Sequence, residues 1–476
     1  DGRRLTYLHS EQGDLSRALW SLDLATGEKS VLLRGPADEN VSREEALRRE
    51  RERLRETGIT HYAWAEEADT LLVPIRGDVT VNGRRIARDA VDPHITRDGR
   101  TVGFVREGWL HVVDTGSGQE RRVVEGGLAE YVAQEEMHRS SGFWFSRDGR
   151  WIAFENFDDR HIPVYRIVHK DGDVEEHRYP FAGERNAIVR LGIIPVEGGP
   201  VAWIDIGENR YLARVSWSPD GRLFVQIQSR DQRTLELWAY TPEGKGTRLL
   251  VEESPLWINL HNDLRFLDSG EFIWASERTG FKHLALHAPD GRLIRVLTQG
   301  AWPVDGVVRV TDREVFFSGW MESPLERHLF KVPISGGPTQ RLTQEPGWHG
   351  ALVAKEGSCF VDIHESRSKS PSVTVRRMDG STMHVLHESQ PLDLPVPELL
   401  SFQARDGEML YASIYRPKET PAACIVSVYG GPHVQHVADT WMQTVDLRAQ
   451  YLAQRGFLVL KVDNRGSARR GLAFEG

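Results

Sequence analysis

The sequence predicts an all-β propeller followed by the opening part of an α/β domain. Three observations carry this prediction: strand-like segments recur at a near-constant spacing, Asp-Gly turns lead into further strand-like segments, and after about residue 392 two apolar segments flank a helical one. A four-stranded propeller blade takes about 40 to 50 residues. Two apolar strands around a helix form a βαβ unit with a parallel pair of strands.

The repeat comes from four strand-like segments that each precede a glycine turn. Their aligned positions, Leu237, Leu284, Leu329 and Val373, lie 47, 45 and 44 residues apart. This spacing matches the length of one blade. The segments are therefore expected to occupy equivalent strands of successive blades.

A second series of turns marks another hairpin of each blade. The segments 96–100, 146–150 and 218–222 each contain Asp-Gly and lead into an alternating or apolar segment, as hairpin turns do. The period breaks between Asp148 and Asp220. We expect an inserted length there, containing the segment from Leu191 to Gly199.

One stretch departs from the β pattern. Ser42 and Glu45 form a capping box, Gly58 suits the position after a helix end, and arginine and glutamate alternate between them,. We expect a helix over about residues 42–57 that projects from the propeller, because it has too few apolar residues to build a core. The helix is either a solvated charged arm or an element that places an arginine side chain in a cleft.

The α/β pattern begins near residue 392. The segment 422–428 is almost continuously apolar, as in strands that are buried in a parallel sheet,. A helical segment ends at Gly456, and the apolar segment 457–462 follows. We expect a propeller domain over residues 1–391 and the first part of an α/β domain over 392–476.

Composition excludes several classes of protein. The 476 residues carry a net charge of −9 with scattered acids, so neither nucleic acid nor an anionic membrane surface is an expected partner. The two cysteines, Cys359 and Cys424, fall in different expected domains, which argues against a disulfide framework or thiolate metal site,. The sequence contains no apolar run long enough to span a membrane and no signal peptide as given,.

Two motifs suggest chemistry. Glu135 and Glu136 stand side by side in an aromatic setting; adjacent carboxylates repel unless they share a cation, and a free α-amino group is largely charged at neutral pH. The alternative is a pair of solvated glutamates. Tyr429 follows the first apolar strand of the α/β segment, the edge where ligand groups gather. Its hydroxyl could donate to an oxyanion, or it could be a core tyrosine before a Gly-Gly-Pro turn.

A family resemblance rests on these residues. The segment from Tyr429 to Ser467 contains the motifs Tyr429–His433, Gln435, Trp441, Leu452-Ala453, Gly456-Phe457 and Asp463–Ser467. It resembles the start of the hydrolase domain of the prolyl oligopeptidase family of serine peptidases. The Glu135-Glu136 segment and the helix around Arg53 resemble more narrowly its dipeptidyl peptidase IV branch, in a pattern similar to bacterial dipeptidyl aminopeptidase IV and dipeptidyl peptidases 8 and 9.

The resemblance implies an eight-bladed propeller and release of X-Pro and X-Ala dipeptides from free peptide N-termini. It implies that Glu135 and Glu136 bind the substrate amine, that Arg53 reaches the carbonyl of the second residue, and that Tyr429 serves the oxyanion hole. Phe281 is a further candidate at the pocket border, with core packing as its alternative. Relatives suggest a homodimer without a cofactor, and a periplasmic location if the protein is bacterial.

One departure from the family is large. No Gly-x-Ser-x-Gly nucleophile motif occurs in the 476 residues, and Ser467 sits in a turn context that does not suit a nucleophile. In this family the Ser, Asp and His triad would follow Gly476, so a separate C-terminal hydrolase fragment is one expected partner. Two alternatives stay open: a catalytically inactive binding homologue, and an acylaminoacyl peptidase or oligopeptidase.

Overall fold

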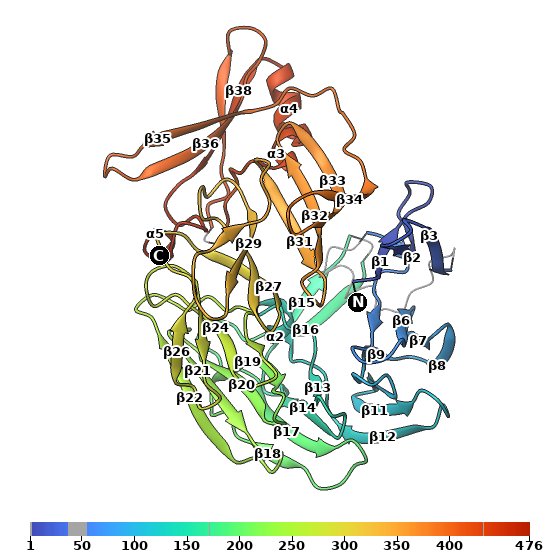
Figure 1. The fold of residues 1–476 in the computed structure, drawn as a ribbon. Helices are drawn as coiled ribbons and strands as arrows, with labels where there is room; N and C mark the ends of the chain where they lie inside the picture. The colour runs from blue at the N-terminus through green and yellow to red at the C-terminus, as the bar shows by residue number, and fades with distance from the viewer. Residues whose placement is uncertain (1, 37–54, 171, 432) are drawn as a thin grey trace. The chain divides into compact units, whose positions relative to one another are not determined.

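The computed structural model describes residues 2–36, 55–170, 172–431 and 433–476. These residues form mainly β-strands with a few short helices (Figure 1). They divide into two compact units. The first unit comprises Arg4–Asp23 and Glu28–Leu260, and the second comprises His261–Gly476 with Leu24–Gly27 and the N-terminal residues.

The first unit is a series of four-stranded sheets, most of them simple antiparallel meanders. The first sheet differs in that its fourth strand, β4, pairs in parallel with β2. The sheets of this unit, in chain order, are β1 (Arg4–His9), β2 (Ser16–Asp23), β3 (Lys29–Arg34) and β4 (Thr57–Gly58); β5 (Ala63–Trp64), β6 (Leu71–Ile75), β7 (Asp78–Val81) and β8 (Arg84–Ala87); β9 (Val91–Ile95), β10 (Thr101–Arg106), β11 (Trp109–Asp114) and β12 (Glu120–Glu125); β13 (Phe143–Phe145), β14 (Trp151–Asp158), β17 (Ile188–Pro195) and β18 (Ala202–Ile204); and β19 (Arg210–Trp217), β20 (Leu223–Ser229), β21 (Thr234–Tyr240) and β22 (Gly246–Glu253).

The second unit continues the series with antiparallel sheets and ends in a mixed one. The antiparallel sheets are β23 (Arg265–Phe266), β24 (Phe272–Ser276), β25 (His283–His287) and β26 (Leu293–Val296); β27 (Val304–Val310), β28 (Glu314–Gly319), β29 (His328–Pro333) and β30 (Gln340–Arg341); and β31 (Trp348–Val353), β32 (Cys359–Ser366), β33 (Lys369–Arg377) and β34 (Thr382–His387). The mixed sheet has the order β35 (Glu398–Gln403), β36 (Met409–Tyr415), β38 (Phe457–Asp463) and β37 (Ala423–Ser427).

Apolar cores lie between successive sheets within each unit. In the second unit, Trp302, Phe317 and Phe330 stack with their ring centroids 5.6 to 6.3 Å apart and join the sheet β23–β26 to the sheet β27–β30. In the first unit, Leu191 and Val225 belong to one cluster that joins two neighbouring sheets. Four-stranded meanders packed face to face are the arrangement of propeller blades.

The repeat in the sequence is confirmed. The aligned positions fall in the third strand of their sheets, and Leu237, Leu284 and Leu329 are fully buried. Each expected Asp-Gly turn joins the first and second strands of a sheet. In the turn before β10, Thr96 Oγ1 donates to Asp98 Oδ1 at 2.7 Å, and Gly99 takes a positive φ of 73°.

The expected insertion is present, but its assignment was wrong in part. The extra length is a two-stranded hairpin, β15 (Val164–Val168) and β16 (Val174–Arg178), between the second and third strands of its sheet. The segment that begins at Leu191 belongs to β17, which pairs with β14 and is buried from Leu191 to Ile194. The apolar run from Leu191 does not itself say whether it pairs within a blade, and only the pairing with β14 assigns it to one.

The βαβ unit is confirmed, since β37 and β38 are parallel and α4 (Leu447–Gln454) lies between them in the chain. The expected burial of the first strand is wrong. Val426 and Val428 are 56% and 70% exposed. The physical reason is that β37 is the edge strand of the mixed sheet, with β38 as its neighbour in the described residues.

The expected helix over about 42–57 lies outside the described residues as far as position 54. Its predicted end is corrected, because Thr57 and Gly58 form strand β4. Gly58 has a φ of 74°, and a Cβ on it would collide with the Arg17 carbonyl oxygen. Among the helices that the structure does describe, none has the length and apolar character needed to cross a bilayer.

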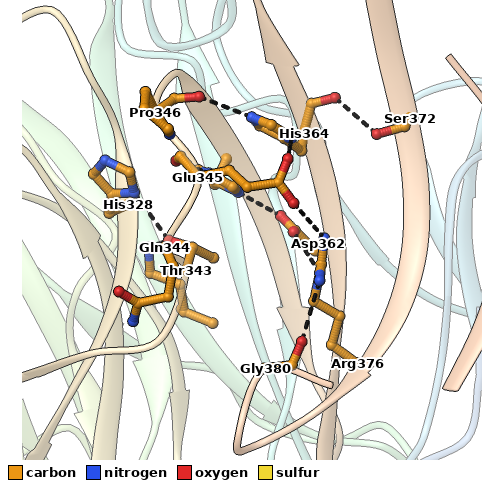
Figure 2. Close-up of polar contacts among 12 residues, drawn as sticks. His328, Thr343, Gln344, Glu345, Pro346, Asp362, His364, Ser372, Arg376 and Gly380 are labelled. Carbon is orange, nitrogen blue, oxygen red and sulfur yellow. Dashed lines mark hydrogen bonds and ion pairs between the residues drawn. The ribbon is translucent and has the colours of Figure 1, made fainter. Parts of the chain in front are cut away.

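The sheet β31–β34 contains a cluster of ionisable side chains, of which Asp362 and His364 are buried (Figure 2). His349 Nδ1 lies 2.7 Å from Asp362 Oδ1, and His349 Nε2 lies 2.9 Å from the Glu345 carbonyl oxygen. Arg376 Nε donates to Asp362 Oδ2 at 2.9 Å. The His364 ring stacks on His349 with centroids 4.2 Å apart. Asp362 therefore carries the charge that balances this cluster.

We predict that Asp362→Asn destabilises the second unit. Burial by itself raises the pKa of Asp362, but the hydrogen bond from His349 and the nearby Arg376 charge hold it below its usual value. A depressed pKa gives stability that is present above the unfolded value near 3.9 and is lost as the pH falls. Removing one partner of a buried pair typically costs about 3–5 kcal/mol.

The measurement is the thermal midpoint by calorimetry near pH 7 and in acid. We expect Asp362→Asn to lower the midpoint by several degrees at pH 7. The gap to wild type should narrow below about pH 4, because there the unfolded chain takes up a proton on this carboxylate while the folded protein, with its lowered pKa, does not yet do so. Asp312→Asn, at an exposed turn position, is the matched control and should change little. A gap that is the same at both pH values would contradict the assigned role of Asp362.

Candidate functional site

The glutamate pair lies at the end of a short helix in the first unit. Helix α2 runs from Tyr131 to Glu135, and Glu136 is its C-cap. Glu135 is half-buried and Glu136 is exposed. Since the pair ends a helix rather than occupying a strand, its two side chains leave consecutive backbone positions at the helix C-terminus.

A buried ion pair holds this helix in place. The Glu130 carboxylate caps the helix by accepting hydrogen bonds from the amides of Val132 at 2.7 Å and Ala133 at 2.8 Å. The Glu130 amide itself donates to Glu155 Oε1 at 2.8 Å. Arg139 Nη2 donates to the other oxygen, Glu155 Oε2, at 2.6 Å. Glu155 on β14 therefore connects the residue before the helix with a residue after it.

Both members of this ion pair are almost fully buried, with side chains 6% (Arg139) and 0% (Glu155) exposed. Arg139 also donates to the carbonyl oxygens of Ser141 at 2.8 Å and Leu212 at 3.2 Å. A buried charge with several hydrogen bonds has little freedom to move, because each lost bond leaves an unpaired buried group. The helix that carries the glutamates is therefore rigidly mounted.

Glu130 sits in an unusual electrostatic position. Burial and the nearby charge of Glu155 raise the pKa of Glu130 to about 7, although the two amides that it caps act in the opposite direction. An acid with a raised pKa costs stability when it is ionised, so this cost is present above about pH 7 and is relieved as the pH falls. The helix N-terminus favours the ionised form.

His177 on β16 and Tyr179 directly after this strand complete the surroundings of the pair. Tyr179 Oη donates to Glu136 Oε1 at 2.8 Å, and this bond, together with burial, raises the pKa of Tyr179 to about 12. The Tyr131 ring lies 4.6 Å from the His177 ring and 6.0 Å from that of Tyr179. The exposed carboxylate of Glu136 is thus oriented by a phenol.

Sequence reasoning did not find these supporting residues. Tyr179 and Glu155 lie 43 and 19 residues beyond the pair in the chain, and no motif links them to it. Glu130 offered a weak signal, since an acid directly before a helix can cap it. The partners became visible only when the strands β14 and β16 placed them beside α2.

Tyr429 lies in the second unit, two residues after β37 ends. Its side chain is well exposed and its ring lies 5.3 Å from the ring of His436. The loop that follows is fixed by Asp463, the last residue of β38, which accepts the amides of His436 at 2.7 Å and Val437 at 2.6 Å. The phenol therefore stands at the carboxyl edge of the parallel pair, as the sequence predicted, and not in a core.

Ser467 has the turn role that the sequence predicted. It is buried, and its Oγ donates to the Asn464 carbonyl oxygen at 2.6 Å. Phe281 lines a pocket of about 410 Å³ in the second unit. A Cβ on Gly471 would lie 2.8 Å from the Phe281 ring, so the close approach of these two residues requires a glycine.

The remaining candidate, Arg53, lies outside the described residues. Its neighbour Arg55 is described and exposed. The candidates are divided between the units: Glu135 and Glu136 belong to the first, and Tyr429 and Phe281 to the second. The described residues include no cluster of three or more histidine, cysteine, aspartate or glutamate side chains suited to a metal ion.

Comparison with known proteins gives relatives that are named as dipeptidyl peptidases. The chain is 25% identical to human dipeptidyl peptidase 8 over 91% of its own length and 63% of that protein. It is 22% identical to dipeptidyl peptidase 4 of Trichophyton tonsurans, over 79% of the chain and 54% of that protein. The chain thus spans less than two thirds of the length of these curated relatives.

The fold has a counterpart among solved structures. The crystal structure of dipeptidyl peptidase 4 from Porphyromonas gingivalis matches with a TM-score of 0.84 at 22% identity, covering 100% of this chain and 72% of the other. The profile of the family described as the dipeptidyl peptidase IV N-terminal region matches residues 59–371. The chain belongs to this family.

Proposed function

We propose that the protein containing this chain is a serine exopeptidase that releases X-Pro or X-Ala dipeptides from peptides with a free N-terminus. The observation that carries the proposal is the Glu135-Glu136 pair at the end of a helix held by a buried ion pair. Two neighbouring carboxylates match an ammonium group, which offers three donors and a compensating charge. The α-amino group of a peptide is such a cation at neutral pH.

The mounting of the pair supports a measuring role. A carboxylate on a mobile loop would bind an amine at variable depth, whereas α2 is fixed by Glu155 and Arg139. Tyr179 holds one oxygen of Glu136, so the orientation of that carboxylate is set before a substrate arrives,. A fixed amine position fixes the number of residues that precede the bond to be cut.

For the chemical step we propose an acyl-enzyme route. A serine supplied by residues outside these 476 attacks the carbonyl carbon of the second substrate residue, and the amine of the third residue leaves. The Tyr429 hydroxyl donates to the oxygen that becomes negative in the tetrahedral intermediate. Arg53 would hold the carbonyl oxygen of the second substrate residue, and Phe281 would border the pocket.

We also propose the architecture in which this chemistry takes place. Residues 1–391 would form an eight-bladed propeller, residues 392–476 the opening of an α/β-hydrolase domain, and two copies of the protein a homodimer. Support comes from the eight successive four-stranded sheets that precede β35 in the described residues, and from the parallel pair β37–β38 with α4 between its strands.

The first test concerns the amine clamp. In the protein that contains this chain together with its nucleophile, we predict that Glu135→Gln with Glu136→Gln lowers kcat/KM for Ala-Pro reporter substrates by at least about 100-fold. Each charge-assisted hydrogen bond to the amine is worth about 1.5–3 kcal/mol, and the amide side chains keep the shape while they remove both charges.

The matched control is Glu125→Gln, an exposed glutamate at the end of β12, which should leave kcat/KM unchanged. Wild-type enzyme should also reject the N-acetylated reporter, because acetylation removes the charge that the pair binds. Equal hydrolysis of free and acetylated reporters, or an unaffected double variant, would rule out the clamp.

The second test concerns Tyr429. We predict that Tyr429→Phe lowers kcat by about 100- to 1,000-fold, because one oxyanion donor is worth about 2.7–4 kcal/mol in the transition state. KM should change little, since the donor acts on charge that develops only during reaction. Tyr451→Phe removes an exposed hydroxyl on α4 and serves as control. A variant with full kcat would exclude Tyr429 from the oxyanion hole.

A further inference from the structure

The pocket that Phe281 lines carries three arginines from the segment after β38. Two of them are already engaged. Arg465 Nε donates to Asp406 Oδ2 at 2.9 Å, and Arg470 Nη1 donates to the Met409 carbonyl oxygen at 2.7 Å. The third arginine is Arg469, and its contacts differ from those of the other two.

Arg469 lies against aromatic rings instead of acceptors. Its guanidinium carbon is 5.2 Å from the ring centre of Trp320 and 4.6 Å from that of Trp348. Among the described residues, Nη1 of Arg469 is buried without a hydrogen-bond partner. Two indole faces stabilise the cation, but they leave its donors unused.

Asp305 and Asp463 are the carboxylates whose charges act on Arg469. Both have other partners. Asp305 Oδ2 pairs with Arg327 Nη2 at 2.6 Å. Asp463 accepts the two loop amides described above. Burial lowers the pKa of Arg469 to about 10, although the charges of these two carboxylates act in the opposite direction. Arg469 also holds a φ of +70°, a conformation that is costly for a residue with a Cβ,.

The pocket is suited to a single negative charge beside apolar groups. Three arginines and two glutamates line it. Arg465 is paired with Asp406 and Arg470 with Glu408, so Arg469 is the lining arginine that has no ion-pair partner among the described residues. Its other walls include Phe281, Trp302, Met321 and Phe474. A planar carboxylate matches the fork of a guanidinium, and the apolar walls match the side chains that a peptide carries next to it.

The pocket residue Arg469 and the oxyanion-hole candidate Tyr429 belong to segments that leave the mixed sheet at the same edge. Strands β37 and β38 are parallel, with Ser427 paired to Lys461. The segments that follow these strands, one with Tyr429 and the other with Arg469, therefore leave the sheet at the same edge. Asp463 connects them through its hydrogen bonds to the loop after Tyr429.

We propose that Arg469 binds a carboxylate of the peptide substrate, on the side of the residues that follow the scissile bond. The carboxylate is either the C-terminus of a short peptide or an acidic side chain, and both offer the same chemistry. The inference rests on the proposed function, in which the glutamates take the amine end of the peptide. It adds a preference for peptides that are negatively charged beyond the second residue.

The test is calorimetric binding of peptides to the 476-residue chain. The probes are Ala-Pro-Phe-Leu with a free C-terminus, the same peptide as a C-terminal amide, and an amide in which Leu is replaced by glutamate. We expect wild type to bind the first or the third probe at least about 10-fold more tightly than the second, in line with one charge-assisted contact. The probe that is preferred identifies the source of the carboxylate.

Arg469→Gln should abolish this preference and leave the affinity for the uncharged amide unchanged. Arg469→Lys keeps the charge without the fork and should retain part of the preference. Arg292→Gln removes an exposed arginine of the same unit and is the matched control. If Arg469→Gln fails to fold, the affinities of wild type and of Arg469→Lys for the three probes still show whether the carboxylate preference depends on the guanidinium of Arg469.

Equal wild-type binding of all three probes would overturn the proposal, as would a preference that survives in Arg469→Gln. The same probes on the Glu135→Gln, Glu136→Gln chain separate this inference from the proposed function. A carboxylate preference with no dependence on the glutamates would keep the Arg469 site and remove the amine clamp. Binding that depends on the glutamates but shows no carboxylate preference would keep the amine clamp and remove the Arg469 site.

Discussion

The ion pair between Glu155 and Arg139 is the interaction on which the candidate site depends. Both groups are buried, so neither can give up its partner without leaving an uncompensated charge in the protein interior,. Glu155 also accepts the amide of Glu130, which caps the helix that ends in the glutamate pair. One carboxylate on a central strand thus fixes a short helix that could not be stable alone, since it spans little more than one turn.

The same rule for buried charge organises the second unit. Asp362 balances His349 and Arg376 between strands, and Asp463 satisfies the backbone of the loop after Tyr429. Arg469 differs from these groups, because its guanidinium lies against aromatic faces and no acceptor within the described residues takes its Nη1 hydrogens. The proposal that Arg469 binds a carboxylate rests on this difference.

Much of the architecture could be predicted from local pattern. The spacing of Leu237, Leu284 and Leu329 indicated equivalent blade strands because each strand must present a buried residue at the same place in its sheet. The Asp-Gly turns were readable because a positive φ and a short side-chain acceptor are local requirements. The errors arose where position in the sheet decides: β17 was taken for an insertion, and β37 was expected to be buried although it is an edge strand.

The sequence by itself determined the presence of a blade repeat, a βαβ unit, and the chemical groups Glu135, Glu136 and Tyr429 at recognisable motifs. Only the tertiary structure decided what supports them. Tyr179 reaches Glu136 from the position directly after the inserted hairpin, and Glu155 reaches the helix from strand β14. The reason is physical: a side chain's type is written in the chain, but its burial and its partners depend on strands that are distant in sequence.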